Sequence, residues 1–174
     1  MKRSIGLWQL CGYAITTLFG TLLHFLYEWL SEAVWVAPFS GVNESTWEHM
    51  KLFFWPAFIF AIVESFFFRE RGDFWSIKLR GILSGLILIP VLFYTYNGVI
   101  GKSPDWVNIA IFFISAAIAF IYEYKLFKAD TLPVTSQKLP LLVLLIIALL
   151  FVIFTYATPQ LGIFMDPESR SYGI

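Results

Sequence analysis

GVNESTWEHMK, residues 41–51, is the polar stretch that separates the first two apolar segments of this chain. Four of its side chains are ionisable, namely Glu44, Glu48, His49 and Lys51. Such groups are costly near the hydrocarbon core of a bilayer, so a cluster of them indicates a turn between two spans, a polar site, or both. His24, the only other histidine, lies in the apolar segment just before this stretch.

The composition is that of an integral membrane protein. Hydrophobic residues make up 59% of the 174 positions and charged residues only 14%, with a mean hydropathy of +0.74. A soluble domain carries about 25% charged residues. The length favours a single domain over residues 1–174. The net charge of zero gives no reason to expect nucleic acid as a partner, and the lone Cys11 excludes an intrachain disulfide and a multi-cysteine zinc site.

Five apolar segments are each long enough to cross a bilayer, because about 20 helical residues span the hydrocarbon core. Helix is the expected conformation, since a helix satisfies its own backbone hydrogen bonds in lipid. We therefore predict an all-α, polytopic membrane helical bundle with spans near residues 5–30, 47–68, 79–96, 106–127 and 139–158. Residues 159–174 are then an interfacial C-terminal segment. Glycines at 81 and 85 predict close contact of the third span with its neighbours.

The basic residues predict how the bundle is oriented. With the amino terminus in the cytoplasm, nine of the twelve basic residues lie on the cytoplasmic side of the predicted spans. Cytoplasmic loops of membrane proteins are enriched in lysine and arginine, so this bias predicts the amino terminus inside and the carboxyl terminus outside. The nine are Lys2, Arg3, Arg69, Arg71, Lys78, Arg80, Lys125, Lys128 and Lys138, and the others are Lys51, Lys102 and Arg170.

This orientation brings distant polar residues to one depth at the outer ends of the spans. Residues three and four apart on a helix share a face. The first span therefore carries one polar stripe, consisting of Tyr13, Thr17, Thr21, His24 and Glu28. Lipid cannot satisfy such a stripe, so we expect it to face the protein interior or a wet cavity. Hydrogen bonding to neighbouring helices and the lining of a pocket are both compatible with it.

Helix capping is one interpretation of the polar stretch. In the segment STWE, Ser45 is expected to accept a hydrogen bond from the backbone, and Glu48 to reach back toward it. Capping accounts for Ser45 and Glu48, but it does not account for His49 or for His24 at a matching depth. The alternative is capping combined with a functional site.

Imidazole and carboxylate groups together suit Zn²⁺ or another divalent metal ion. A catalytic zinc takes three protein ligands and one water molecule. His24 and His49, with one of Glu28, Glu44 or Glu48, could supply these ligands, and we take Glu44 as the third. Without a metal ion, the same groups could relay protons.

The remaining carboxylates are the candidate catalytic groups. Glu28 and Glu48 lie beside the expected ligands, where one of them could serve as a general base. Asp166 joins them if the C-terminal segment folds over the site as a lid; otherwise this segment is an interfacial anchor.

Two further carboxylates lie toward the inner ends of the spans. We expect Glu64 and Glu123 to pair at the interface with basic residues whose long side chains reach the headgroups, namely Arg69, Arg71, Lys125 or Lys128. Alternatively, the two carboxylates form the inner end of a proton or ion path, which would favour a transporter over an enzyme.

The chain resembles a family of small bacterial multi-pass membrane proteins of unknown function. The resemblance rests on His24 and Glu28, on residues 41–51, and on FMDP and YG at residues 164–167 and 172–173. It covers most of the chain and implies a helical protein of the bacterial cytoplasmic membrane, without implying an activity or ligand. The histidine–carboxylate pattern is also similar to that of metal-dependent membrane hydrolases such as the alkaline ceramidase group, whose fuller set of histidines this chain lacks.

Two classes of function follow from these observations. The first is a metal-dependent membrane hydrolase that acts on a lipid or lipid-linked substrate. The second is a small transporter or a solute- or ion-binding protein with a polar cavity, and a structural subunit of a membrane complex is a third possibility. Membrane lipids are the expected partners in every case, and the sequence leaves open whether the chain is an enzyme.

Overall fold

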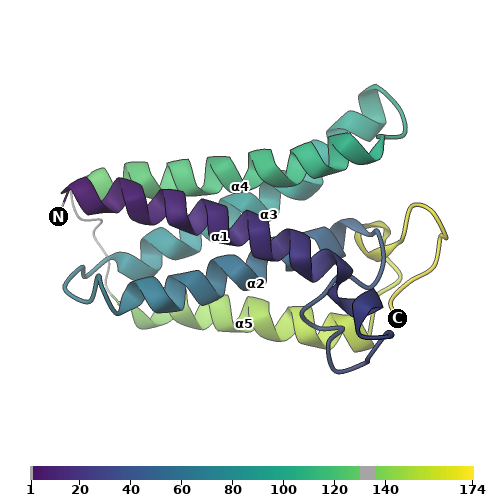
Figure 1. The fold of residues 1–174 in the computed structure, drawn as a ribbon, viewed down its shortest axis with the longest axis horizontal. Helices are drawn as coiled ribbons and strands as arrows, with labels where there is room; N and C mark the ends of the chain where they lie inside the picture. Colours follow the sequence, from purple (N-terminus) through teal and green to yellow (C-terminus); the bar gives the residue numbers. More distant parts are fainter. Residues whose placement is uncertain (1, 130–135) are drawn as a thin grey trace.

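The computed structural model describes residues 2–129 and 136–174, and the described residues form a bundle of antiparallel helices (Figure 1). Consecutive helices run in opposite directions along its long axis. The helices are α1 (Lys2–Trp29), α2 (Thr46–Ser65), α3 (Phe74–Val99), α4 (Asp105–Lys128) and α5 (Lys138–Tyr156), followed by the short 3₁₀ helix η1 (Gly162–Phe164). The prediction of an all-α fold is therefore confirmed.

Helix α2 is the central element of the bundle. It packs against α1 and α3, and it also contacts α4, α5 and η1. Phe53, Phe54 and Ala61 are completely buried in it, and Phe53 and Phe54 belong to a core cluster that extends to α3, α4 and α5. Burying this much aromatic surface is a large part of what holds the helices together.

Four helices in the described part of the chain, α1, α3, α4 and α5, are long and apolar enough to cross a membrane. They correspond to four of the five predicted spans. Helix α2 is more polar at its start, because Glu48, His49 and Lys51 lie in its first two turns. Its 20 residues extend about 30 Å, which equals the thickness of the hydrocarbon core.

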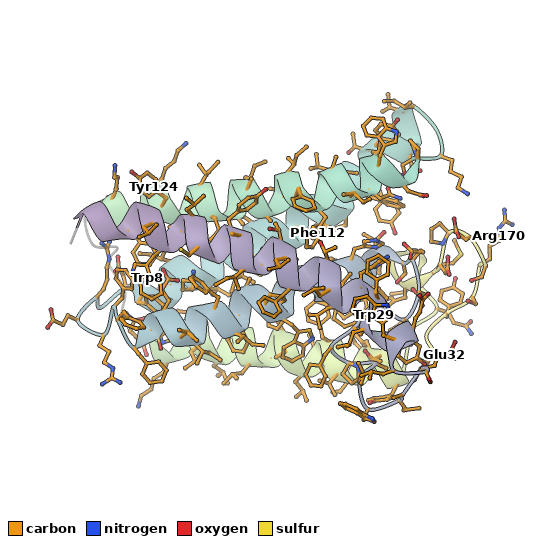
Figure 2. The ribbon with its side chains drawn as sticks, viewed as in Figure 1. Trp8, Trp29, Glu32, Phe112, Tyr124 and Arg170 are labelled. Carbon is orange, nitrogen blue, oxygen red and sulfur yellow. The ribbon has the colours of Figure 1, made fainter. Side chains whose placement is uncertain are left out.

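Both long segments outside the helices lie at one end of the bundle, on the right in Figure 1. We call it the C-terminal end; it comprises residues 30–45, 100–104 and 157–174. The opposite, N-terminal end comprises the start of α1 and residues 66–73. Figure 2 places Trp29, Glu32 and Arg170 at the C-terminal end, and Trp8 and Tyr124 near the other.

Replacing Gly81 with alanine is expected to lower the free energy of unfolding by about 1–3 kcal/mol, the usual cost of overpacking. Gly81 allows the Glu123 side chain of α4 to lie directly against the α3 backbone, and an added methyl group would overlap that side chain. Thermal unfolding in detergent measures the effect. Gly98→Ala is the matched control, because open space surrounds Gly98 on the same helix. Equal unfolding temperatures for the two variants would contradict the close contact.

Candidate functional site

A polar cavity of about 290 Å³ opens at the C-terminal end of the bundle. The residues that line it come from five parts of the chain: the end of α1, the stretch 41–51, the end of α3 with the loop that follows it, the start of α4 and the C-terminal segment. They are His24, Glu44, His49, Phe93, Asn97, Lys102, Ser103, Asp105, Asn108, Ile109, Pro167 and Glu168. We call this cavity the C-terminal pocket.

Local hydrogen bonds shape the polar stretch so that it borders the pocket. The Asn43 side chain accepts from the backbone N–H of Ser45 at 2.9 Å, which makes a tight turn. Ser45 is the N-cap of α2, and its hydroxyl accepts from the N–H of Glu48 at 3.4 Å. This half of the predicted capping box is confirmed, whereas the Glu48 carboxylate accepts instead from the N–H of Val42 at 3.1 Å.

The turn brings both histidines against one carboxylate. His24 Nε2 lies 3.4 Å from one oxygen of Glu44, and His49 Nε2 lies 3.6 Å from the other. The two imidazole rings are 5.8 Å apart between centroids. The structure thus places His24, Glu44 and His49 together, as the antiparallel topology predicted.

The His49 ring is oriented by the backbone. Its Nδ1 lies 3.0 Å from the carbonyl oxygen of Ser45, which can only accept, so Nδ1 carries a hydrogen. In neutral His49 the lone pair of Nε2 then faces a carboxylate oxygen of Glu44. Two acceptors that face each other repel unless a proton resides on one of them. His49 and Glu44 can therefore hold one proton between them, and groups that share a proton in this way are suited to a proton relay.

The predicted zinc site has no support in this geometry. Across residues 2–129 and 136–174, no group of three or more His, Cys, Asp or Glu side chains is arranged to hold a metal ion. His24 and His49 each face a different oxygen of Glu44, so the carboxylate lies between the two rings.

Glu48, a predicted catalytic carboxylate, lies in a buried ion pair. Its Oε2 is 2.5 Å from the ammonium group of Lys51, whose side chain is completely buried. Lys51 also donates to the carbonyl oxygen of Ala37 at 2.7 Å and to the Thr155 hydroxyl at 3.3 Å. All three N–H groups of the ammonium are thereby used. The pair ties the loop after α1 to α2 and α5, which is a structural role.

Glu28 and Asp166, the other two predicted catalytic carboxylates, do not line the C-terminal pocket among the described residues. Glu28 is exposed on α1, one turn beyond His24. Asp166 is buried, and its carboxylate accepts from the N–H groups of Glu168 at 2.7 Å and Ser169 at 3.4 Å. Asp166 therefore shapes the turn that presents Glu168 to the pocket.

The C-terminal segment is packed onto the bundle. The ring of Phe164 lies 4.6 Å from that of Trp47 and 5.6 Å from that of Phe154. The Asn43 side chain donates to the carbonyl oxygen of Gly173 at 3.1 Å, which ties the end of the segment to the stretch 41–51. The segment thus forms one wall of the pocket.

Six polar pocket residues were not predicted. Asn97, Ser103 and Asn108 form a connected network, in which the Ser103 N–H donates to Asn97 at 2.9 Å and its hydroxyl donates to Asn108 at 2.7 Å. The signal in the sequence was the position of these polar residues at the same predicted depth as His24. The other three are Lys102, Asp105 and Glu168.

The prediction that Glu64 and Glu123 pair with basic residues at the membrane interface is wrong. Both are buried, and both contact Lys78 on α3, whose ammonium group is also buried. Arg71, one of the predicted partners, instead pairs with Asp73 at 2.6 Å and donates to the carbonyl oxygen of Phe127 at the end of α4.

Comparisons with known proteins add the family but no activity. A search of curated proteins and a search of solved structures each gave no match. A family model matches all of residues 1–174, and its family is described as one of unknown function. The chain therefore belongs to DUF6512, a family of unknown function.

Proposed function

We propose that this chain is a small membrane transporter or solute-binding protein that takes a small organic cation into the C-terminal pocket. One observation carries the proposal: among the described residues, three carboxylates, Glu44, Asp105 and Glu168, line the pocket against a single lysine, Lys102. With neutral histidines the lining carries a net negative charge. Such a cavity attracts and concentrates cations.

The proposal places the chain in a cell membrane with the C-terminal pocket on the outer side. The bias of basic residues toward the other side of the spans supports this orientation. It also takes α2 as a fifth span, shielded from lipid by its neighbours. The charges of α2 support this view, because Glu48 is paired with Lys51, and Glu64 with Lys78.

Hydrolysis of a lipid or lipid-linked substrate stays a prediction with less support. It needs a general base beside the reacting atoms. The Glu48 carboxylate is in an ion pair with Lys51, and the Asp166 carboxylate accepts a hydrogen bond within its own turn. Glu28 does not line the pocket among the described residues. The pocket has better-placed groups for binding a cation than for activating a water molecule.

Small ammonium ions are expected to stabilise the wild-type protein against heat, because a ligand that binds only the folded state raises its stability. The probes are tetramethylammonium, ethylammonium and putrescine, with acetate as a small anion for comparison. The double variant Glu44→Gln, Asp105→Asn should require at least about tenfold more of the cation for the same stabilisation, since a charge contact contributes about 1.4 kcal/mol or more. Thermal unfolding in detergent gives the titration curves.

The matched control is Glu32→Gln, which removes an exposed carboxylate at the same end of the bundle but outside the pocket lining (Figure 2). It should respond to the cations as the wild type does. The proposal is wrong if none of the three ammonium ions stabilises the protein, or if the double variant responds like the wild type. If a cation does stabilise the protein, its uptake into vesicles that contain the protein would distinguish a transporter from a solute-binding protein.

A further inference from the structure

A second polar cluster lies inside the bundle, between four helices. It consists of Gln9 on α1, Glu64 on α2, Lys78 on α3 and Glu123 on α4. All four side chains are buried, with exposed fractions of 4% or less. Lys78 donates to Glu123 Oε2, and Gln9 Nε2 donates to Glu64 Oε1 at 2.9 Å. We call these residues the carboxylate–lysine cluster.

The charges in the cluster do not balance. Among the described side chains, two ionised carboxylates against one ammonium leave a net charge of −1 in the buried interior of the bundle. Around the cluster, the rings of Phe60 and Phe120 lie 5.9 Å and 5.4 Å from Lys78 Nζ. Helix α5 has only one charged residue, Lys138, which is exposed at its start. An unbalanced buried charge costs several kcal/mol, so a further positive charge is expected here.

The hydrogen bonds show where that charge can reside. Glu64 Oε2 lies 2.8 Å from the Lys78 ammonium in an ion pair, so the Glu64 oxygen that can carry a proton is Oε1, which faces the Gln9 amide. The amide oxygen of Gln9 is buried with no hydrogen-bond partner among the described residues. A half turn of the Gln9 amide would let this oxygen accept from a protonated Glu64. Gln9 can thus serve both protonation states of the carboxyl group.

We propose that the carboxylate–lysine cluster binds one exchangeable proton, which its two carboxyl groups share and which reaches it from the C-terminal pocket past Thr16 and Ser115. This site is separate from the cation site, and it does not depend on which solute the pocket takes. In a transporter, a buried carboxyl that gains and loses a proton supplies the coupling to a proton gradient.

Two buried hydroxyl groups mark the route. Thr16 and Ser115 are completely buried, and neither hydroxyl has a hydrogen-bond partner within the described part of the chain. Ser115 is eight residues from Glu123 and seven from Asn108, which are about 12 Å and 10 Å along α4. Thr16 is likewise seven residues from Gln9 and eight from His24 on α1. Unpaired buried hydroxyls are costly, so water molecules are expected beside them, and water conducts protons.

Infrared spectroscopy of the full-length protein in lipid vesicles tests the site, because the carbonyl stretch of a protonated carboxyl group is distinct from that of a carboxylate. The wild type is expected to show this band at neutral pH. Glu64→Gln and Glu123→Gln should each lose it, since Lys78 balances the one carboxylate that is left. Glu70→Gln, which removes an exposed glutamate, is the matched control and should retain it.

Three results would overturn the proton site: no band in the wild type, persistence of the full band in both single variants, or loss of the band when sodium chloride replaces choline chloride at constant pH. The last would mean that a sodium ion balances the charge. The double variant Thr16→Val, Ser115→Ala tests the route. It should keep the band but slow its response to a pH jump, and an unchanged rate would refute the route.

Discussion

Replacing Lys78 with methionine is expected to destabilise the folded protein by about 3–5 kcal/mol, the usual cost of removing one partner from a buried ionic cluster. Methionine keeps the length of the side chain, so the loss is electrostatic. Without the ammonium, the carboxyl groups of Glu64 and Glu123 are buried together with no positive charge between them. Unfolding in detergent micelles, by heat or by added dodecyl sulfate, measures the difference.

The triple variant Lys78→Met, Glu64→Gln, Glu123→Gln should recover most of the lost stability, because it leaves no charge in the cluster. The stability deficit of Lys78→Met should also shrink at low pH, where both carboxyl groups are neutral in the folded and the unfolded protein alike. Lys125→Met removes an exposed lysine from α4 and should have little effect. A triple variant no more stable than Lys78→Met would show that charge is not the cause.

The sequence predicted the helices well but assigned the wrong partners to Glu64 and Glu123. The reason is a helix boundary. The third span was predicted to begin at residue 79, which put Lys78 in an interfacial loop, whereas α3 begins at Phe74 and carries Lys78 into the bundle. Apolar composition locates the part of a helix that meets lipid, and it misses a polar turn that is covered by other helices.

The sequence predicted the level along the bundle at which the residues of the C-terminal pocket lie, but not which side chains point into it. Antiparallel spans place His24 opposite the start of the next helix, so the meeting of His24 with Glu44 and His49 followed from topology. The direction in which each side chain points depends on the rotation of each helix, which hydropathy does not fix. Glu28 therefore faces outward although it shares the predicted stripe with His24. Glu168 reaches the pocket through a turn made by Asp166, which depends on tertiary packing.

The two buried ionic groups of α2 explain why this helix, unlike the other four described helices, is not apolar enough by composition to cross a membrane. Glu48 and Lys51 lie near one end of it and Glu64 near the other, and each is shielded by neighbouring helices or loops. In a bundle this small, the central helix has little contact with lipid, so its charges need partners rather than an apolar surface. The charges of α2 thus help to specify which helices and loops surround it.

Replacing Lys51 with methionine tests this view at the C-terminal end, with an expected loss of about 3–5 kcal/mol in the free energy of unfolding. The change leaves Glu48 buried without its counterion and removes the donor to the carbonyl oxygen of Ala37. Adding Glu48→Gln should recover only part of the loss, because the neutral side chain can still accept from Val42 but the Ala37 carbonyl stays without its donor.

Lys102→Met, which removes an exposed lysine at the same end, is the control for unfolding in detergent. If Lys51→Met unfolds like Lys102→Met, the Glu48–Lys51 pair does not hold the loop after α1, and Glu48 is free for the catalytic role that the sequence first indicated.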